Sequence, residues 1–337
     1  MNKHLLLHLK TVLWTGMMVC LLVGCSTPGT LPPTTPPEPV TLRINWQHGV
    51  QFLGFYAAQA QGYYAAEGLD VAIEPRPDAV DADKEPEWIA AGEFDFSVGS
   101  RNLLSAQAQG VPVTAIGAIF QLNPSAFFGR ADSGIVTPAD LAGRTVVVKG
   151  DAWRDLLRVL LEHDGLTLAD VKEVPGGFDM TPFFEGEVEV WAGYLTNEAV
   201  LARQQGLELV TLPLYEYGIH NYSAAIYTGQ ESLAANPDRA ARFLRASLRG
   251  WEWAVENPTE AVDVMLELYP DMAAERDFHL ASFDASIPLI HPRGIRLGTI
   301  DCAVWYAHEL LADLPTSPAS GEGFCTTSIL EAAWEGE

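Results

Sequence analysis

Positive charge is scarce in this chain. Lysine and arginine together number 20 against 44 aspartate and glutamate residues, and the formal net charge is −24 at pH 7. No basic cluster follows Lys10, and the only later lysines are Lys84, Lys149 and Lys172. A surface this acidic repels phosphate backbones and anionic headgroups. Nucleic-acid binding is therefore excluded as a function.

Cysteine is also sparse, and its spacing excludes the common metal motifs. There is no Cys-x-x-Cys, and the histidines after Val40 are scattered, so we expect neither a metal site nor a cofactor. No Gly-x-Ser-x-Gly arrangement suggests hydrolysis. Cys302 and Cys325 could form one disulfide in an oxidising compartment or remain two thiols, because spacing alone does not show proximity.

The apolar run from Thr11 to Gly24 is too short for an ordinary spanning helix, which needs roughly 20 residues. Lys3 and Lys10 accompany it, and small residues lead into Cys25, an order typical of an export signal. The segment Leu22–Cys25 resembles a lipoprotein lipobox. That resemblance implies that residues 1–24 are a signal peptide and that Cys25 is lipidated. The alternative is an uncleaved anchor.

Both alternatives place the functional part outside the cytoplasmic membrane, either lipid-anchored on the outer face of the cell membrane or in the periplasm. Residues 25–39 contain six prolines and almost no bulky apolar side chain. Such a segment cannot bury a core and is expected to be an extended tether. The folded part is expected to begin near Val40.

From Val40 onward, strand-like and helix-like segments alternate, which predicts mostly parallel sheets flanked by helices. The predicted strands are Thr41–Trp46, Leu69–Glu74, Phe94–Val98, Val113–Ile119, Gly143–Val148, Val188–Tyr194 and Leu207–Leu212. The predicted helices are Phe55–Glu67, Glu85–Ala91, Asn102–Gln109, Ala152–His163, Glu198–Gln205, Asp238–Glu256, Thr259–Leu268, Ala273–Ser286 and Ile300–Leu311.

The pattern restarts once, which predicts an α/β fold with two lobes. Residues 40–121 and 215–337 would form lobe 1, including a helical C-terminal part, and residues 122–214 would form lobe 2. The chain would cross between them near Pro124–Phe128 and Tyr215–Ile226. Two crossings make a hinged cleft that can close around a small ligand.

Four segments carry a resemblance to a known family. They are WQHGVQFLGFYAAQAQGYYAAEGLDV (46–71), GEFDFSVGS (92–100), IFQLNPSAF (119–127) and GEVEVWAGYLTNEAVLARQQGLELVTLPLYEYGIHNYSAAIYT (186–228). In this order they resemble the substrate-binding proteins of ABC transporters in the sulfonate, nitrate and thiamine-pyrimidine-precursor group. The last block is typical of the thiamine-pyrimidine-precursor branch. Glu189 and Ala199 depart from the family pattern, which usually has Asp and Pro there.

The resemblance implies a periplasmic-binding-protein fold of type II and a role in capturing a ligand for an ABC permease and its ATPase. Ligands of open α/β sheets bind at the carboxyl ends of strands. At those ends the sequence places aromatic, amide and hydroxyl side chains and one carboxylate. The predicted ligand-binding residues are Trp46, Gln51, Phe52, Ser100, Gln121, Tyr194, Asn197, Glu198 and Tyr222.

Several of these residues have an alternative in packing. Trp46 could belong to the core, Glu198 could stabilise the first turn of a helix through the helix dipole, and Tyr222 could pack at a hinge.

Flat aromatic walls with a few directed hydrogen bonds suit a small heteroaromatic ligand, such as a thiamine pyrimidine precursor or a riboflavin-like compound. Asp151, beside Gly150, would repel an anion.

Three other functions stay open. A sulfonate- or nitrate-type anion receptor has the same resemblance. A thiamine-pyrimidine synthase would use a lysine and a histidine near the start of the domain and a cysteine-rich motif. This chain has His48, but no lysine between Lys10 and Lys84 and no cysteine between Cys25 and Cys302. A sensory partner protein could also use the fold. We expect a binding protein that is not an enzyme.

Overall fold

The computed structural model describes residues 36–77, 84–99, 101–219, 222–306 and 323–336. The predicted signal peptide, Cys25 and Ser100 lie outside these residues. Within them, no helix combines the length and the apolar character that crossing a membrane requires.

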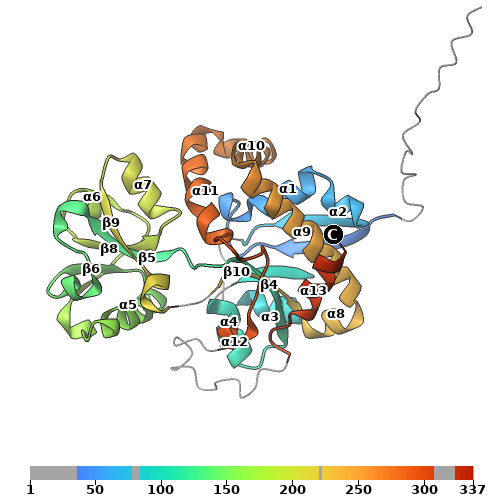
Figure 1. The fold of residues 1–337 in the computed structure, drawn as a ribbon, viewed down its shortest axis with the longest axis horizontal. Coiled ribbons are helices and arrows are strands. Elements are labelled where there is room, and N and C mark those ends of the chain that lie inside the picture. Colours follow the sequence, from blue (N-terminus) through green and yellow to red (C-terminus); the bar gives the residue numbers. More distant parts are fainter. Residues whose placement is uncertain (1–35, 78–83, 100, 220–221, 307–322, 337) are drawn as a thin grey trace, which may run out of the picture. The chain divides into compact units, whose positions relative to one another are not determined.

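The first sheet has five strands in the order β2-β1-β3-β10-β4, and Figure 1 labels two of them, β4 and β10. Its strands are β1 (Glu38–Arg43), β2 (Leu69–Glu74), β3 (Phe96–Gly99), β4 (Val113–Phe120) and β10 (Ser223–Gly229). Strand β1 pairs in parallel with β2 and β3, whereas β10 is antiparallel to both β3 and β4. The helices of this half of the fold are α1 (Leu53–Ala60), α2 (Tyr63–Ala66), α3 (Glu85–Ala90), α4 (Arg101–Ala108), α8 (Gln230–Ala235), α9 (Pro237–Glu256), α10 (Pro258–Leu268), α11 (Arg276–Ile290), α12 (Cys302–Tyr306) and α13 (Ser328–Glu335).

The second sheet repeats this plan in the order β7-β6-β8-β5-β9. Its strands are β5 (Ser125–Arg130), β6 (Thr145–Val148), β7 (Lys172–Pro175), β8 (Val190–Tyr194) and β9 (Leu209–Pro213). Strand β6 is parallel to β7 and β8, and β5 is antiparallel to β8 and β9. The helices of this half are α5 (Asp151–His163), α6 (Thr181–Phe184) and α7 (Glu198–Gln204). Short 3-10 helices occur in both halves, at Val50–Phe52, Ala131–Ser133, Pro138–Leu141, Leu168–Asp170, Leu214–Tyr217 and Pro270–Glu275.

The chain passes between the two sheets twice, as predicted. It leaves the first sheet after β4 and enters the second as β5, and it returns from β9 to the first sheet as β10. Strand β5 was not predicted, because SAFFGR contains no β-branched residue and lies where only a crossing was expected. The predicted α/β class with two sheets is confirmed. The exact lobe boundaries, at residues 121–122 and 214–215, stay a proposal.

Two predicted boundaries are wrong. Strand β1 begins at Glu38, inside the predicted tether, because the Glu38 amide donates to the carbonyl of Gly68 at 2.8 Å and starts the pairing with β2. The single helix predicted over Phe55–Glu67 is two helices, α1 and α2. Gly62 separates them with φ 72°, a left-handed conformation that glycine adopts without strain.

Each sheet has its own apolar core, and the core of the first sheet depends on a very close contact between α1 and α9. Gly54 of α1 faces the indole of Trp251, and Gly250 of α9 faces the backbone of Gly54 and Ala58. No room exists at either glycine for a side chain. Trp251 is fully buried and packs edge-on against Phe55, with ring centroids 5.7 Å apart.

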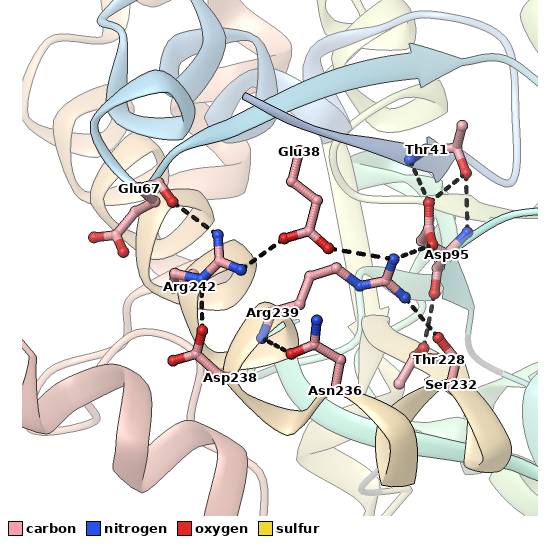
Figure 2. A network of polar contacts seen from close by, with 10 residues as sticks. All are labelled: Glu38, Thr41, Glu67, Asp95, Thr228, Ser232, Asn236, Asp238, Arg239 and Arg242. Atoms are coloured by element: carbon pink, nitrogen blue, oxygen red, sulfur yellow. Dashed lines mark hydrogen bonds and ion pairs between the residues drawn. The ribbon is translucent and has the colours of Figure 1, made fainter. Parts of the chain in front are cut away.

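A polar network joins the start of β1 to the first turns of α9 (Figure 2). Asp95 accepts hydrogen bonds from the backbone amide and hydroxyl of Thr41 at 2.8 and 3.0 Å, and an ion pair of 3.0 Å joins it to Arg239. Glu38 binds Arg242 at 2.7 Å. Asp95 belongs to one of the segments that carry the family resemblance, and its role here is to hold β1, β3 and α9 together.

The C-terminal segment covers the edge of β4. Cys325 pairs in parallel with Ala115, and the Ala115 amide donates to the Phe324 carbonyl at 2.9 Å. A disulfide joins Cys325 to Cys302 of α12. Trp305, also on α12, donates to the side chain of Gln107 at 2.9 Å.

Glu85 is a buried carboxylic acid in the first turn of α3. The residue is fully buried, and neither carboxyl oxygen has a hydrogen-bond partner within the described part of the chain. Burial raises the pKa of Glu85 to about 7, and the nearby Arg76 and Arg43 limit the rise.

We predict that Gly250→Ala destabilises the protein. Its Cβ would overlap the carbonyl oxygen of Gly54 and lie 2.6 Å from the Cβ of Ala58. The expected loss in the free energy of unfolding is about 1–3 kcal/mol, measured by urea denaturation. Gly177→Ala is the control, because no atom lies within 4 Å of the added Cβ. Equal urea midpoints for the two variants would contradict the close α1–α9 contact.

We also predict that Glu85 makes stability depend on pH. Its pKa is higher in the folded than in the unfolded protein, so the folded state binds more protons between about pH 4.5 and 7. Stability should therefore fall as pH rises through this window, by roughly 2–3 kcal/mol from this group. Glu85→Gln should match the wild type at pH 5 and be more stable at pH 8. A difference between the two proteins that does not change with pH would refute the assignment.

Candidate functional site

Five side chains that follow strands of the two sheets belong to one chain of contacts, in which Trp153 of α5 joins Lys149 to Tyr194. They stand at or just after the carboxyl ends of parallel strands, where open α/β sheets bind ligands. They are Trp46 after β1, Arg76 after β2, Lys149 after β6, Phe178 after β7 and Tyr194 at the end of β8.

The aromatic members of this site are unusually exposed. Trp46 is 44% exposed, Phe178 76% and Tyr194 41%, and they make up half of the large exposed hydrophobic side chains in the described residues. The ring centroids of Trp46 and Phe178 lie 6.0 Å apart. The guanidinium carbon of Arg76 lies 4.7 Å from the centroid of the Trp46 ring. Exposed aromatic side chains that cluster in this way indicate a binding surface. We call the three exposed side chains Trp46, Phe178 and Tyr194, together with the buried Trp153 that packs against Tyr194, the aromatic cluster.

A buried ion pair lies beside the aromatic cluster. Lys149 Nζ contacts Glu198 Oε1, and the two side chains are only 9% and 6% exposed. The ammonium group lies 5.3 Å from the ring centroid of Trp153 and 5.9 Å from those of Phe178 and Trp191. Removing two charges from water is costly unless they neutralise each other, so this pair is strongly coupled.

Glu198 also fixes the end of β8. Its second oxygen, Oε2, accepts a hydrogen bond from the backbone amide of Tyr194 at 2.9 Å. Gly193 makes this possible, because a Cβ there would lie 2.9 Å from the carboxyl carbon of Glu198. Glu198 is therefore positioned by the first turn of α7 and by the absence of a side chain at residue 193.

Tyr194 presents a neutral phenol at the site. Its ring packs edge-on against Trp153, with centroids 5.4 Å apart. Although the residue is 41% exposed, desolvation by the surrounding protein and the charge of Glu198 raise the pKa of Tyr194 to about 12. The hydroxyl therefore stays protonated at neutral pH.

The structure brings three predicted site residues together. Trp46 and Tyr194 belong to the aromatic cluster, and Glu198 lies beside it. Asn197 is exposed and precedes α7, next to Glu198. Gln51 is half-buried, and its amide lies against Gly49.

Three other predicted residues have packing roles in this structure. Phe52 is 1% exposed and lies in the core of the first sheet. Gln121 donates its amide to the carbonyls of Ala118 and Thr299 at 2.8 and 2.9 Å. Tyr222 accepts a hydrogen bond from the Asp301 amide at 3.0 Å, which is the hinge-packing alternative for this residue. Of these three residues, only Gln121 stands at the end of a predicted strand, and all three stay predictions as ligand contacts.

The sequence reasoning did not select Arg76, Lys149, Trp153 or Phe178. Lys149 directly follows a predicted strand and could have been found by the rule that selected Trp46. Phe178 could not, because β7 (KEVP) carries too little apolar pattern to be recognised as a strand. Among the described residues, no three His, Cys, Asp or Glu side chains are arranged to hold a metal ion.

Two α/β sheets, two crossings and an aromatic site at the strand ends define a periplasmic-binding-protein fold of type II, in agreement with the prediction. The NMT1/THI5-like family matches residues 50–261, which is more than half of the chain. This protein belongs to that family.

Similar proteins include two that are named as binding proteins and one that is named as a synthase. The chain is 32% identical to the riboflavin-binding protein RibY of Chloroflexus aurantiacus, over 77% of this chain and 78% of that protein. It is 26% identical to a formylaminopyrimidine-binding protein of Halalkalibacterium halodurans, over 68% and 70% of the two chains. It is 25% identical to a 4-amino-5-hydroxymethyl-2-methylpyrimidine phosphate synthase of Legionella pneumophila, over 69% and 74%.

Solved structures share the fold at low identity. The periplasmic aliphatic sulphonate binding protein SsuA from Escherichia coli superposes with a TM-score of 0.64 at 16% identity, covering 80% of this chain and 88% of that one.

We predict that Lys149 and Glu198 are energetically coupled. Lys149→Met should cost about 3 kcal/mol or more in the free energy of unfolding, because it leaves a buried carboxylate without its cation. The double variant K149M/E198Q should recover part of that loss. Urea denaturation of the wild type, both single variants and the double variant measures the coupling. Additive losses would show that the two charges do not depend on each other.

Proposed function

We propose that this protein is an exported substrate-binding component of an ABC importer that captures a small heteroaromatic compound. The candidate ligands are a thiamine pyrimidine precursor and a riboflavin-like molecule. The observation that carries the proposal is the exposed aromatic cluster beside an ion pair that is already neutralised. RibY and the formylaminopyrimidine-binding protein, both named for heteroaromatic ligands, support it.

The chemistry of the site suits a flat and uncharged ring. Trp46 and Phe178 offer ring faces and edges, and aromatic pairs contribute about 0.5–1.5 kcal/mol beyond the buried area. The Tyr194 hydroxyl supplies a directed hydrogen bond, and the exposed Asn197 amide can both donate and accept. A pyrimidine or flavin edge needs that combination.

Closure of the two halves would complete the site. Ser282 of α11, in the first half, donates its hydroxyl to the carbonyl of Thr196, which lies between Tyr194 and Glu198 in the second half. A hydrogen bond between the halves beside the site residues stabilises a closed conformation. Ligand binding favours closure through contacts that only the closed state makes.

We infer that the protein binds its ligand without transforming it. His48 is held by the Tyr56 hydroxyl at 2.9 Å and stacks on Tyr269 with centroids 3.8 Å apart. The chain also has no lysine between Lys10 and Lys84 and no cysteine between Cys25 and Cys302, which separates it from the pattern of the synthases. Lipidation of Cys25, the tether and the permease and ATPase partners belong to the same proposal.

We predict that the mature protein binds riboflavin or formylaminopyrimidine, but not taurine or nitrate, in calorimetric titrations. Trp46→Ala should weaken binding about tenfold or more, because it removes an exposed ring of the aromatic cluster. Trp334→Ala is a matched control, since this tryptophan lies in α13 and outside the cluster. Tight binding of taurine or nitrate without binding of either heteroaromatic compound would overturn the proposal.

Small-angle scattering tests the closure. The radius of gyration of the wild type should decrease when the compound that binds in the titrations is added. Constant scattering at saturating ligand would argue against closure as the mechanism.

A further inference from the structure

Lys149 is a cation that lies between the end of β6 and the start of α5. It follows β6 directly, and α5 begins two residues later with Gly150 as its N-cap. Gly150 has no side chain with which to cap the first-turn amides of this 13-residue helix. A lysine beside the start of a helix is a combination that favours negative charge. Asp151 is in the same turn, but its side chain is exposed to solvent.

Glu198 already occupies that position. Its Oε1 contacts the Lys149 ammonium, and its Oε2 accepts from the Tyr194 backbone amide. A cation and a backbone N–H group are the partners that an anionic ligand group would need. The carboxylate reaches them from α7, on a different element, through the space left by Gly193.

We propose that the Lys149–Glu198 pair is an anion site filled by the protein itself, and that Glu198 is the residue that restricts the ligand to uncharged compounds. This inference rests on the proposed function and adds the reason for its selectivity. A second anion beside Lys149 would meet the charge of Glu198 within a nearly buried site, where repulsion is poorly screened. A neutral ring beside the same pair meets no net charge.

Removing the negative charge should therefore open the site to anions. Glu198→Gln removes the charge with little change in shape, and its NH2 group cannot neutralise Lys149, so an anion gains Lys149 once the Gln side chain turns aside. We expect ethanesulfonate or nitrate to bind the variant at least tenfold more tightly than the wild type. The melting temperature of the variant should also rise with the concentration of either anion.

Two further variants make the result specific. The double variant K149M/E198Q should lose the gained affinity, because the cation is absent. Glu231→Gln, at an exposed position in the first turn of α8, is a matched control and should bind anions as weakly as the wild type. Glu198→Ala also empties the space that a Gln side chain still fills, and K149M/E198A is its matching double variant.

The outcomes separate this inference from the proposed function. The inference is overturned if neither folded E198Q nor folded E198A gains anion affinity, or if the gain persists in the matching double variant that lacks Lys149. A gain that requires Lys149 supports it, even if the wild type binds neither riboflavin nor formylaminopyrimidine. In that case the proposed ligand class fails while the self-filled anion site stands. Wild-type protein that binds ethanesulfonate as tightly as E198Q also overturns the inference.

Discussion

Each sheet of this protein contains, at an interior position, a strand that the chain reaches only by crossing from the other sheet. Strand β10 lies between β3 and β4, and β5 lies between β8 and β9. The core of the first sheet is therefore incomplete until the chain has returned, and Ile226 and Tyr227 of β10 are fully buried in it. Pairings of such long sequence separation form slowly and commit both halves of the chain to one topology. Each hinge segment joins the edge strand of one sheet, β4 or β9, to an interior strand of the other, β5 or β10.

The candidate site is a consequence of this arrangement. Because β6, β7 and β8 run parallel in one sheet and β1 and β2 in the other, their carboxyl ends deliver Trp46, Arg76, Lys149, Phe178 and Tyr194 to one set of contacts. Beside this set, Glu198 neutralises Lys149, and Arg76 adds a positive charge over Trp46, although the chain as a whole is strongly acidic. The surface charge therefore says little about the ligand, and the local pairing says much more.

Much of this could be predicted from the sequence, and the rest could not for identifiable reasons. Alternating periodicity predicted the two α/β units, and the strand-end rule predicted Trp46, Tyr194 and Glu198. The same rule also predicted Gln121, whose amide turns back to the carbonyls of Ala118 and Thr299, because the direction of a side chain at a strand end depends on tertiary packing. The Asp95 motif shows the same limit: a recognisable segment carries a residue whose contacts hold the fold together (Figure 2).

The C-terminal segment has a consequence beyond its own attachment. Strand β4 is the last strand of the first sheet, and its outer N–H and C=O groups at Ala115 are taken by Phe324 and Thr326. An open edge of this kind is a template for strands of other molecules. The covering segment is held by the disulfide between Cys302 and Cys325 and by hydrogen bonds from Gln107 and Gln230, so this part of the edge is closed to strands of neighbouring molecules.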